Sequence, residues 1–356
     1  MKSVLLTILI FVFAFAAVAQ SGRIKPTETP TPAPRPRVVY LPAQTNSEPV
    51  KPKPTPTPIS KNDDNDEGEV IRINSNLVPI PVSVTDAAGR SVTNLRLADF
   101  ELSVDGKPAE IAELSRSEAP VRLALLFDNS LSVTSAREFE KKAAIRFFRR
   151  VLRPEKDLAA LFSVATVSRL EQPLTKNVSS LVNAIENFPE PAGATALLDA
   201  IIKAANYLKD SNGRRVIVIV SDGEDNVSDA SLEETVKSLQ ANNCQVYIVK
   251  TTDFENFKQN GIRTPNANVR FLAGERRMQE IGNQTGGAVY SPIDEAELDA
   301  AFARISAELA QQYILNYYPE DTAQSGEFRT IALRVRNKKD LTVRTRKGYY
   351  VPRTYQ

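Results

Sequence analysis

The chain has 356 residues, of which 42% are hydrophobic and 25% are charged, and these proportions are typical of a soluble globular protein. Its 45 basic and 43 acidic residues give a net charge of only +2. The electrostatic field of a nearly neutral protein does not attract nucleic acid or an anionic membrane. The sequence has no histidine and a single cysteine, Cys244, which excludes Ser-His-Asp triads, ordinary zinc sites and intrachain disulfides.

Residues 1–19 have the features of a secretory signal peptide. Lys2 supplies a short basic region, an apolar stretch runs from Val4 to Val18, and Ala17-Val18-Ala19 forms a small-residue cleavage site before Gln20. We therefore expect an exported protein in the periplasm, at the cell surface or outside the cell. The apolar stretch is shorter than the roughly 20 residues that a membrane span needs, so no span is expected after cleavage.

Residues 20–68 are rich in proline and threonine, as in the stretches TPTPAPRPR and KPKPTPTP, and they end in a polar run. Such a segment buries too little apolar surface to offset the entropy lost on ordering. The sequence therefore predicts a disordered linker, which its prolines stiffen into a semi-rigid spacer.

Residues 69–118 show the period-2 alternation of half-buried strands. Apolar residues alternate with other residues from Val78 to Val84 and again from Phe100 to Val104. Asp105-Gly106 predicts a tight hairpin directly after the second of these strands.

Residues 119–315 alternate between apolar strands and amphipathic helices. The expected strands are 123–127, 158–164, 216–220, 246–249 and 288–290, and the expected helices are 139–152, 181–188, 197–208, 232–239, 278–281 and 296–309. Strands without alternation, interleaved with helices, predict an α/β fold with a doubly wound, mostly parallel sheet and helices on both faces. Ligands of such sheets bind at the carboxyl ends of the strands.

Residues 316–356 return to strand patterns. With about four strands before the α/β domain and three after it, period-2 matching predicts a small sandwich. Our hypothesis is that 316–356 pairs with 69–118 as a β-sandwich-like domain that flanks the α/β domain. Arginines 334, 336, 344 and 346 alternate along this segment and are expected on a solvated sheet face.

Oxygen-bearing side chains follow two of the apolar strands. Asp128, Ser130 and Ser132 follow the first at every second position, Asp222 follows the VIVIV strand, and Thr195 stands in a glycine-containing loop before a helix. If the two strands are neighbours, the two aspartates converge above the sheet. These hard oxygen ligands suit Mg²⁺ or Mn²⁺. Each residue also suits a helix cap or a turn, but their order along the chain favours one metal site.

The order D-x-S-x-S, G-x-T and S-D-G resembles the metal-ion-dependent adhesion site of von Willebrand factor type A domains, over about residues 121–315. Leu131 departs from the glycine that the family often has between the two serines, without removing an oxygen ligand. The stretch from Val82 to Lys107 and the ending at Gly348–Tyr350 further resemble exported bacterial proteins with a related domain.

This resemblance implies a binding or adhesion protein rather than an enzyme. Ser130, Ser132 and Thr195 would bind Mg²⁺ (or Mn²⁺) directly or through water, with Asp128 and Asp222 bound directly or through another ligand. An open coordination position would accept an acidic side chain of an unknown protein partner, and its binding would shift the helix at 296–309.

Two alternatives stay open at this point. The first is a structural interaction module whose metal site is unused. The second is a metal-dependent phosphohydrolase, since an aspartate after an apolar strand also opens aspartyl phosphatases. Those enzymes need a second acid two residues further on as general acid, and Ser130 stands there.

Overall fold

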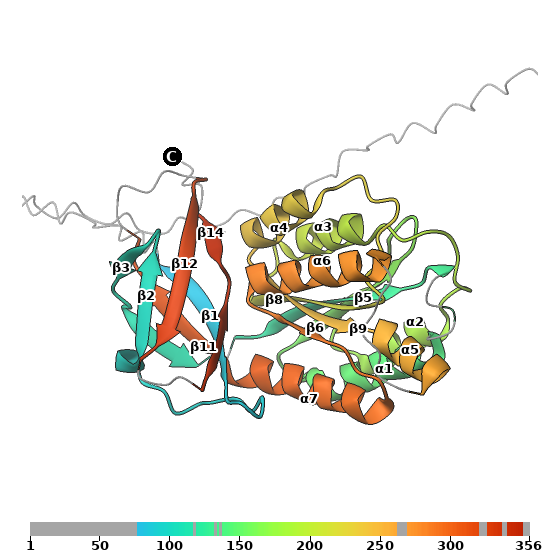
Figure 1. The fold of residues 1–356 in the computed structure, drawn as a ribbon, viewed down its shortest axis with the longest axis horizontal. Helices are drawn as coiled ribbons and strands as arrows, with labels where there is room; N and C mark the ends of the chain where they lie inside the picture. Colours follow the sequence, from blue (N-terminus) through green and yellow to red (C-terminus); the bar gives the residue numbers. More distant parts are fainter. Residues whose placement is uncertain are drawn as a thin grey trace, which may run out of the picture. The chain divides into compact units, whose positions relative to one another are not determined.

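A computed structural model of the chain describes residues 77–116, 119–131, 134, 137–261, 269–319, 326–336 and 340–351 (Figure 1). The predicted signal peptide, the predicted linker, residues 69–76 and Ser132 lie outside the described residues. All elements below belong to one compact unit, Ile71–Gln356.

The strands and helices follow in chain order. The strands are β1 (Val78–Thr85), β2 (Phe100–Val104), β3 (Lys107–Ala109), β4 (Glu113–Arg116), β5 (Val121–Asp128), β6 (Leu158–Val164), β7 (Arg169–Thr175), β8 (Arg214–Ser221), β9 (Cys244–Lys250), β10 (Ala288–Tyr290), β11 (Tyr313–Tyr317), β12 (Phe328–Val335), β13 (Thr342–Thr345) and β14 (Gly348–Tyr350). The helices are the 3₁₀ turn η1 (Leu97–Asp99), α1 (Arg137–Val151), α2 (Val178–Glu186), α3 (Leu197–Leu208), α4 (Leu232–Ala241), α5 (Thr252–Asn260), α6 (Val269–Thr285) and α7 (Glu295–Gln311).

The α/β domain is built on a six-stranded sheet in the order β10-β9-β8-β5-β6-β7. Five strands run parallel, and β7 pairs antiparallel with β6 at one edge. The predicted α/β fold with a mostly parallel sheet is confirmed. β7 was not predicted, because its sequence RLEQPLT contains no apolar run and most of its side chains are only half-buried.

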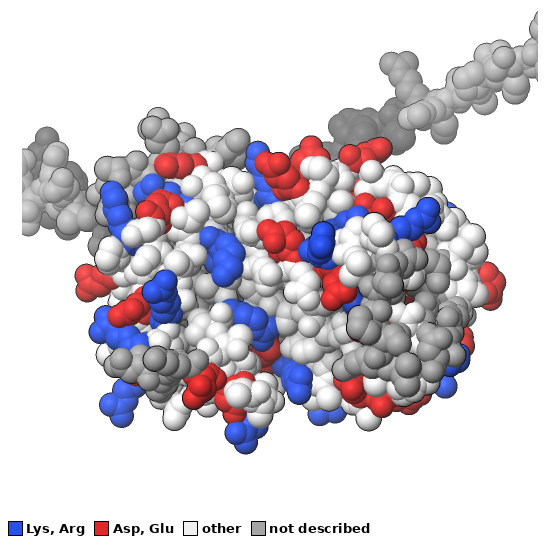
Figure 2. Space-filling model, in the orientation of Figure 1, with Lys and Arg blue, Asp and Glu red and all other residues white. Residues whose placement is uncertain are grey.

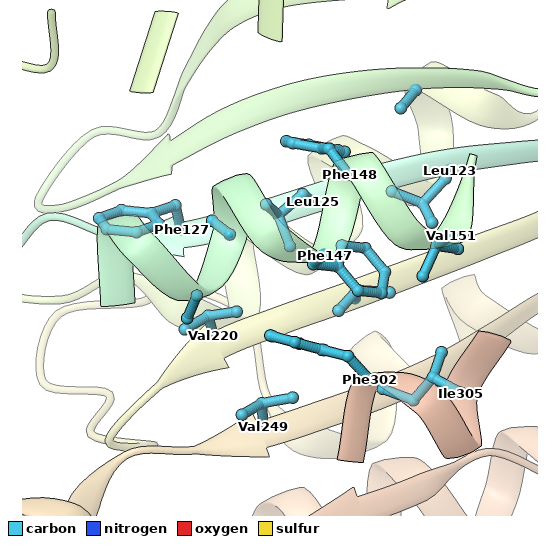
Figure 3. Close-up of a cluster of buried hydrophobic side chains, with 14 of the residues drawn as sticks. Leu123, Leu125, Phe127, Phe147, Phe148, Val151, Val220, Val249, Phe302 and Ile305 are labelled. Carbon is cyan, nitrogen blue, oxygen red and sulfur yellow. The ribbon is translucent and has the colours of Figure 1, made fainter. Parts of the chain in front are cut away.

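Helices cover both faces of this sheet, α1, α2 and α7 on one face and α3, α4 and α6 on the other (Figure 1). In the first layer, Phe147 of α1 and Phe302 of α7 pack together over the strands, with ring centroids 4.9 Å apart (Figure 3). Alternate residues of β5 serve the two layers, Leu125 in one and Leu126 in the other. Burial on both faces explains why these strands are continuously apolar.

The remaining strands form two four-stranded antiparallel sheets, ordered β13-β1-β11-β4 and β14-β12-β2-β3. The segments before and after the α/β domain pair with each other, since β1 pairs with β11 and β13, and β12 pairs with β2. Both sheets contribute to one apolar cluster, in which Phe100 and Tyr313 meet edge to face. The eighth strand, which exceeds the seven expected, is the short β14.

The hairpin predicted at Asp105-Gly106 is confirmed. Val104 and Lys107 are directly paired, and the two residues between them have positive φ angles of 49° and 77°. A two-residue turn in which both residues have positive φ matches the twist of the antiparallel strands that it joins. An Asp-Gly pair adopts this turn at low steric cost.

The expectation of a fully solvated arginine face was wrong for two of the four residues. Arg334 and Arg336 are exposed, but Arg344 and Arg346 are largely buried against the α/β domain. Arg344 forms an ion pair with the buried Glu308 of α7 and donates to the Gly287 carbonyl at 3.0 Å. The spacing of Arg344 and Arg346 places both side chains on one face of the chain at β13. The α/β domain covers that face, so the two side chains are not solvated.

Glu308 also accepts hydrogen bonds from the hydroxyls of Tyr247 and Tyr290, each at 3.1 Å. Glu308 therefore joins β13 to α7 through its ion pair, and joins α7 to β9 and β10 through the two tyrosine hydrogen bonds.

Among the described helices, none combines the length and apolarity needed to cross a membrane.

We predict that Glu308→Ala lowers the free energy of unfolding by about 3–5 kcal/mol, because it leaves the Arg344 guanidinium buried without its carboxylate. The matched control is Glu101→Ala, which removes the acid of an exposed pair in which Arg336 is 56% and Glu101 is 52% exposed, and it should cost about 0–1 kcal/mol. Urea unfolding of both variants measures the difference, and equal costs would contradict the role of Glu308.

Candidate metal centre

Two aspartates lie at the carboxyl ends of neighbouring parallel strands. Asp128 is the last residue of β5, and Asp222 directly follows β8, which pairs with β5 through Phe127 and Val220. The two aspartates are 0% and 2% exposed. The chain thus buries two carboxylates at one edge of the sheet.

The Asp128 carboxylate is surrounded by hydrogen-bond donors. Its Oδ1 accepts from the backbone N–H of Ser130 at 3.0 Å and from the Ser130 hydroxyl at 2.7 Å, and its Oδ2 accepts from the Ser221 hydroxyl at 2.5 Å. Burial first, and then the neighbouring Asp222 carboxylate, raise the pKa of Asp128 to about 7, although the hydrogen bonds from Ser221 and Ser130 oppose this rise.

Backbone hydrogen bonds join the three loops that carry the candidate residues. The N–H of Leu131 donates to the Gly193 carbonyl at 3.3 Å, and the N–H of Asn226 donates to the Thr195 carbonyl at 2.8 Å. Gly193 has φ +77°, and a Cβ there would lie 2.5 Å from the Thr166 hydroxyl oxygen. Only glycine fits this approach, which brings the middle loop against the loop after β6.

The structure brings together most of the residues predicted from the sequence. Asp128, Ser130 and Asp222 are buried at the carboxyl ends of β5 and β8, and Thr195, 1% exposed, lies on the loop bonded to both neighbouring loops. Ser132 lies outside the described residues.

Sequence reasoning missed the part played by Ser221, the last residue of β8. Its hydroxyl donates to Asp128 and accepts from the Gly223 N–H at 3.0 Å, so it links the two strand ends. The available signal was its position directly before Asp222, at the end of a buried strand.

Asp225, three residues after Asp222, is half-buried and caps a helix. Its Oδ1 accepts from the backbone N–H groups of Leu197 and Leu198 at 2.8 and 3.3 Å, which caps the first turn of α3. Since Thr195 lies two residues before this helix, the cap fixes the start of the helix close to Thr195. The Asp222 side chain is held in a similar way, by the N–H of Glu224 at 2.8 Å.

The donor set at this edge fits a hard divalent cation. The described residues contain no group of three or more His, Cys, Asp or Glu side chains placed to hold a metal ion. The carboxyl ends of β5 and β8 instead offer the carboxylates of Asp128 and Asp222 together with neutral hydroxyl oxygens. Mg²⁺ accepts such ligands together with water. The two carboxylates are buried so close together that Asp222 raises the pKa of Asp128. A cation bound between them would offset their repulsion.

Comparisons with known proteins identify a domain that includes these candidate residues. Residues 123–224 match the sequence profile of the von Willebrand factor type A domain. A von Willebrand factor type A protein from Catenulispora acidiphila is 12% identical, with 78% of this chain and 75% of that chain covered and a TM-score of 0.45. The protein BatB from Bacteroides thetaiotaomicron is 17% identical, with coverages of 53% and 98% and a TM-score of 0.42. A search of curated proteins finds no match.

We predict that, with EDTA present, Asp128→Asn becomes more stable relative to wild type as the pH rises from about 4 to about 7. In wild type the folded state keeps this carboxyl protonated up to about pH 7. The unfolded state releases the proton near pH 4, so folding stability is lost across that interval. The asparagine amide cannot ionise and should avoid this loss, which is on the order of a few kcal/mol.

Urea unfolding of both proteins at pH 4, 5.5 and 7 measures the effect. A stability difference that does not change with pH would contradict the raised pKa.

Proposed function

Because the chain carries a von Willebrand factor type A domain, a fold of protein-interaction modules, we propose that it is an exported binding or adhesion protein that recognises a protein partner through a Mg²⁺-dependent site. The observation that carries this proposal is the meeting of Asp128 and Asp222, both buried, at the carboxyl edge of the sheet. The signal-peptide features of residues 1–19 support export.

The protein's contribution at this site is a preorganised set of oxygens. Asp128 and Asp222 supply the negative charge, and Ser130 supplies a neutral oxygen, as Thr195 and Ser132 are proposed to do. Mn²⁺ would suit the same ligands. With only two carboxylates among these residues, a bound Mg²⁺ would stay electrophilic and offer a coordination position to an acidic side chain of the partner.

The loops around the site expose apolar side chains that a protein partner would cover. Leu131, Val167 and Val227 are 62%, 67% and 44% exposed. Each lies on a loop bonded to the 193–195 segment, through the contacts of Leu131 with Gly193, Thr166 with Ala194 and Val227 with Thr195. Exposed apolar residues beside a polar site are typical of interaction surfaces. On the face drawn in Figure 2, charges of both signs are interspersed.

We predict that millimolar Mg²⁺ raises the melting temperature of the wild-type protein and has no effect on Asp128→Ala. A ligand at 100 times its dissociation constant stabilises the folded state by about 2.7 kcal/mol. The control is Asp157→Ala, which removes the acid that pairs with Arg153 near the start of β5, lowers the melting temperature, and should keep the response to Mg²⁺. Differential scanning calorimetry after EDTA treatment gives the measurement. A wild type that does not respond would mean that the metal site is unused.

We predict further that wild-type protein immobilised in Mg²⁺ retains a partner from a native extract, and that EDTA releases it. Leu131→Ser should retain less partner while its melting temperature still responds to Mg²⁺, because this exposed side chain lies outside the proposed ligand set. Retention that is equal in EDTA would contradict recognition through the cation.

A further inference from the structure

A cavity of about 540 Å³ lies at the end of the sheet opposite to the metal centre. The first residues of β8 and β9 form one wall, and the strands β1, β4 and β11 of the β-sandwich form another. Arg214 begins β8 and Ser221 ends it. At a rise of about 3.3 Å per residue, the cavity and the metal centre are separated by roughly 23 Å.

Four arginines line this cavity, Arg116, Arg214, Arg215 and Arg346, and none of the described residues that line it is acidic. The described residues show no ion pair between any of the four and a carboxylate. Arginines that face a cavity are normally compensated by carboxylates, so this lining carries an excess of positive charge.

Two of the four have a structural role that accounts for their position. Arg214 donates to the Leu309 carbonyl at 2.6 Å, near the end of α7, and Arg215 donates to the Asn242 carbonyl at 2.9 Å, directly after α4. Cations are stabilised at the carboxyl ends of helices. These two contacts therefore do not by themselves indicate a ligand.

Arg346 differs from them. It is 8% exposed, its Nη2 donates to the Pro79 carbonyl at 2.8 Å, its Nη1 donates to Asn243, and its Nε has no hydrogen-bond partner. Its guanidinium lies 5.5 Å from the ring centroid of Tyr349, and burial lowers its pKa to about 10. A buried cation with an unused donor is costly to the folded chain unless an anion compensates it.

We propose that this cavity binds a small organic anion, whose carboxylate or phosphate head is held by Arg346 and Arg116. The planar guanidinium donates in parallel to either head group. Leu239, Ile314 and Pro79 line the same cavity and give the ligand an apolar contact surface. The volume falls in the range of small-molecule sites, about 300–1,000 Å³. The ligand would contact the sandwich and the α/β domain together.

Calorimetric titration of the full chain tests this with octanoate, octyl phosphate, inorganic phosphate and the uncharged 1-octanol as probes. At least one of the two octyl anions should bind, and the tighter of them identifies the preferred head group. 1-Octanol should bind at least about tenfold more weakly, since it lacks the charge that the arginines compensate.

Arg116→Gln and Arg346→Gln should each weaken binding by about tenfold or more. Arg116 is exposed, so its variant remains informative even if Arg346→Gln fails to fold. Arg334→Gln, an exposed arginine outside the cavity, should bind like wild type. Affinity should be the same in Mg²⁺ and in EDTA, which separates this site from the metal centre. Failure of both octyl anions to bind, equal binding of 1-octanol, or unchanged affinity in Arg116→Gln would overturn the proposal.

Discussion

The burial of two like-charged side chains at one sheet edge constrains the rest of the α/β domain. Asp128 and Asp222 repel each other, and their removal from water raises the free energy of the charged forms. The fold tolerates them because hydroxyl and backbone donors surround Asp128, and because loop-to-loop hydrogen bonds hold the neighbouring segments in place. Such an arrangement lowers the stability of the protein without a metal ion, and a cation bound at the candidate site would offset that cost.

The sequence predicted those parts of the fold whose signal is local. Continuous apolar runs identified the buried parallel strands, and the Asp105-Gly106 pair identified a hairpin. β7 was missed because an antiparallel edge strand with half-buried side chains has no apolar run. The hydrogen bond from Ser221 to Asp128 and the burial of Arg344 depend on which elements become neighbours in three dimensions. No periodicity within a single segment contains that information.

The same sheet connects the two ends of the α/β domain. β8 ends beside the candidate metal centre and begins at the arginine-lined cavity, while Glu308 of α7 forms an ion pair with Arg344 of β13. The family resemblance implies a shift of α7 on partner binding, and through this buried ion pair such a shift would act on β13 and the β-sandwich.

We propose that a divalent cation binds between Asp128 and Asp222, and anomalous diffraction from crystals grown with Mn²⁺ would locate it. We expect an anomalous peak in contact with oxygens of Asp128, Ser130 or Asp222, at the carboxyl ends of β5 and β8. A well-ordered map without a peak there, in which Asp128 still accepts the hydrogen bond from Ser221, would contradict it.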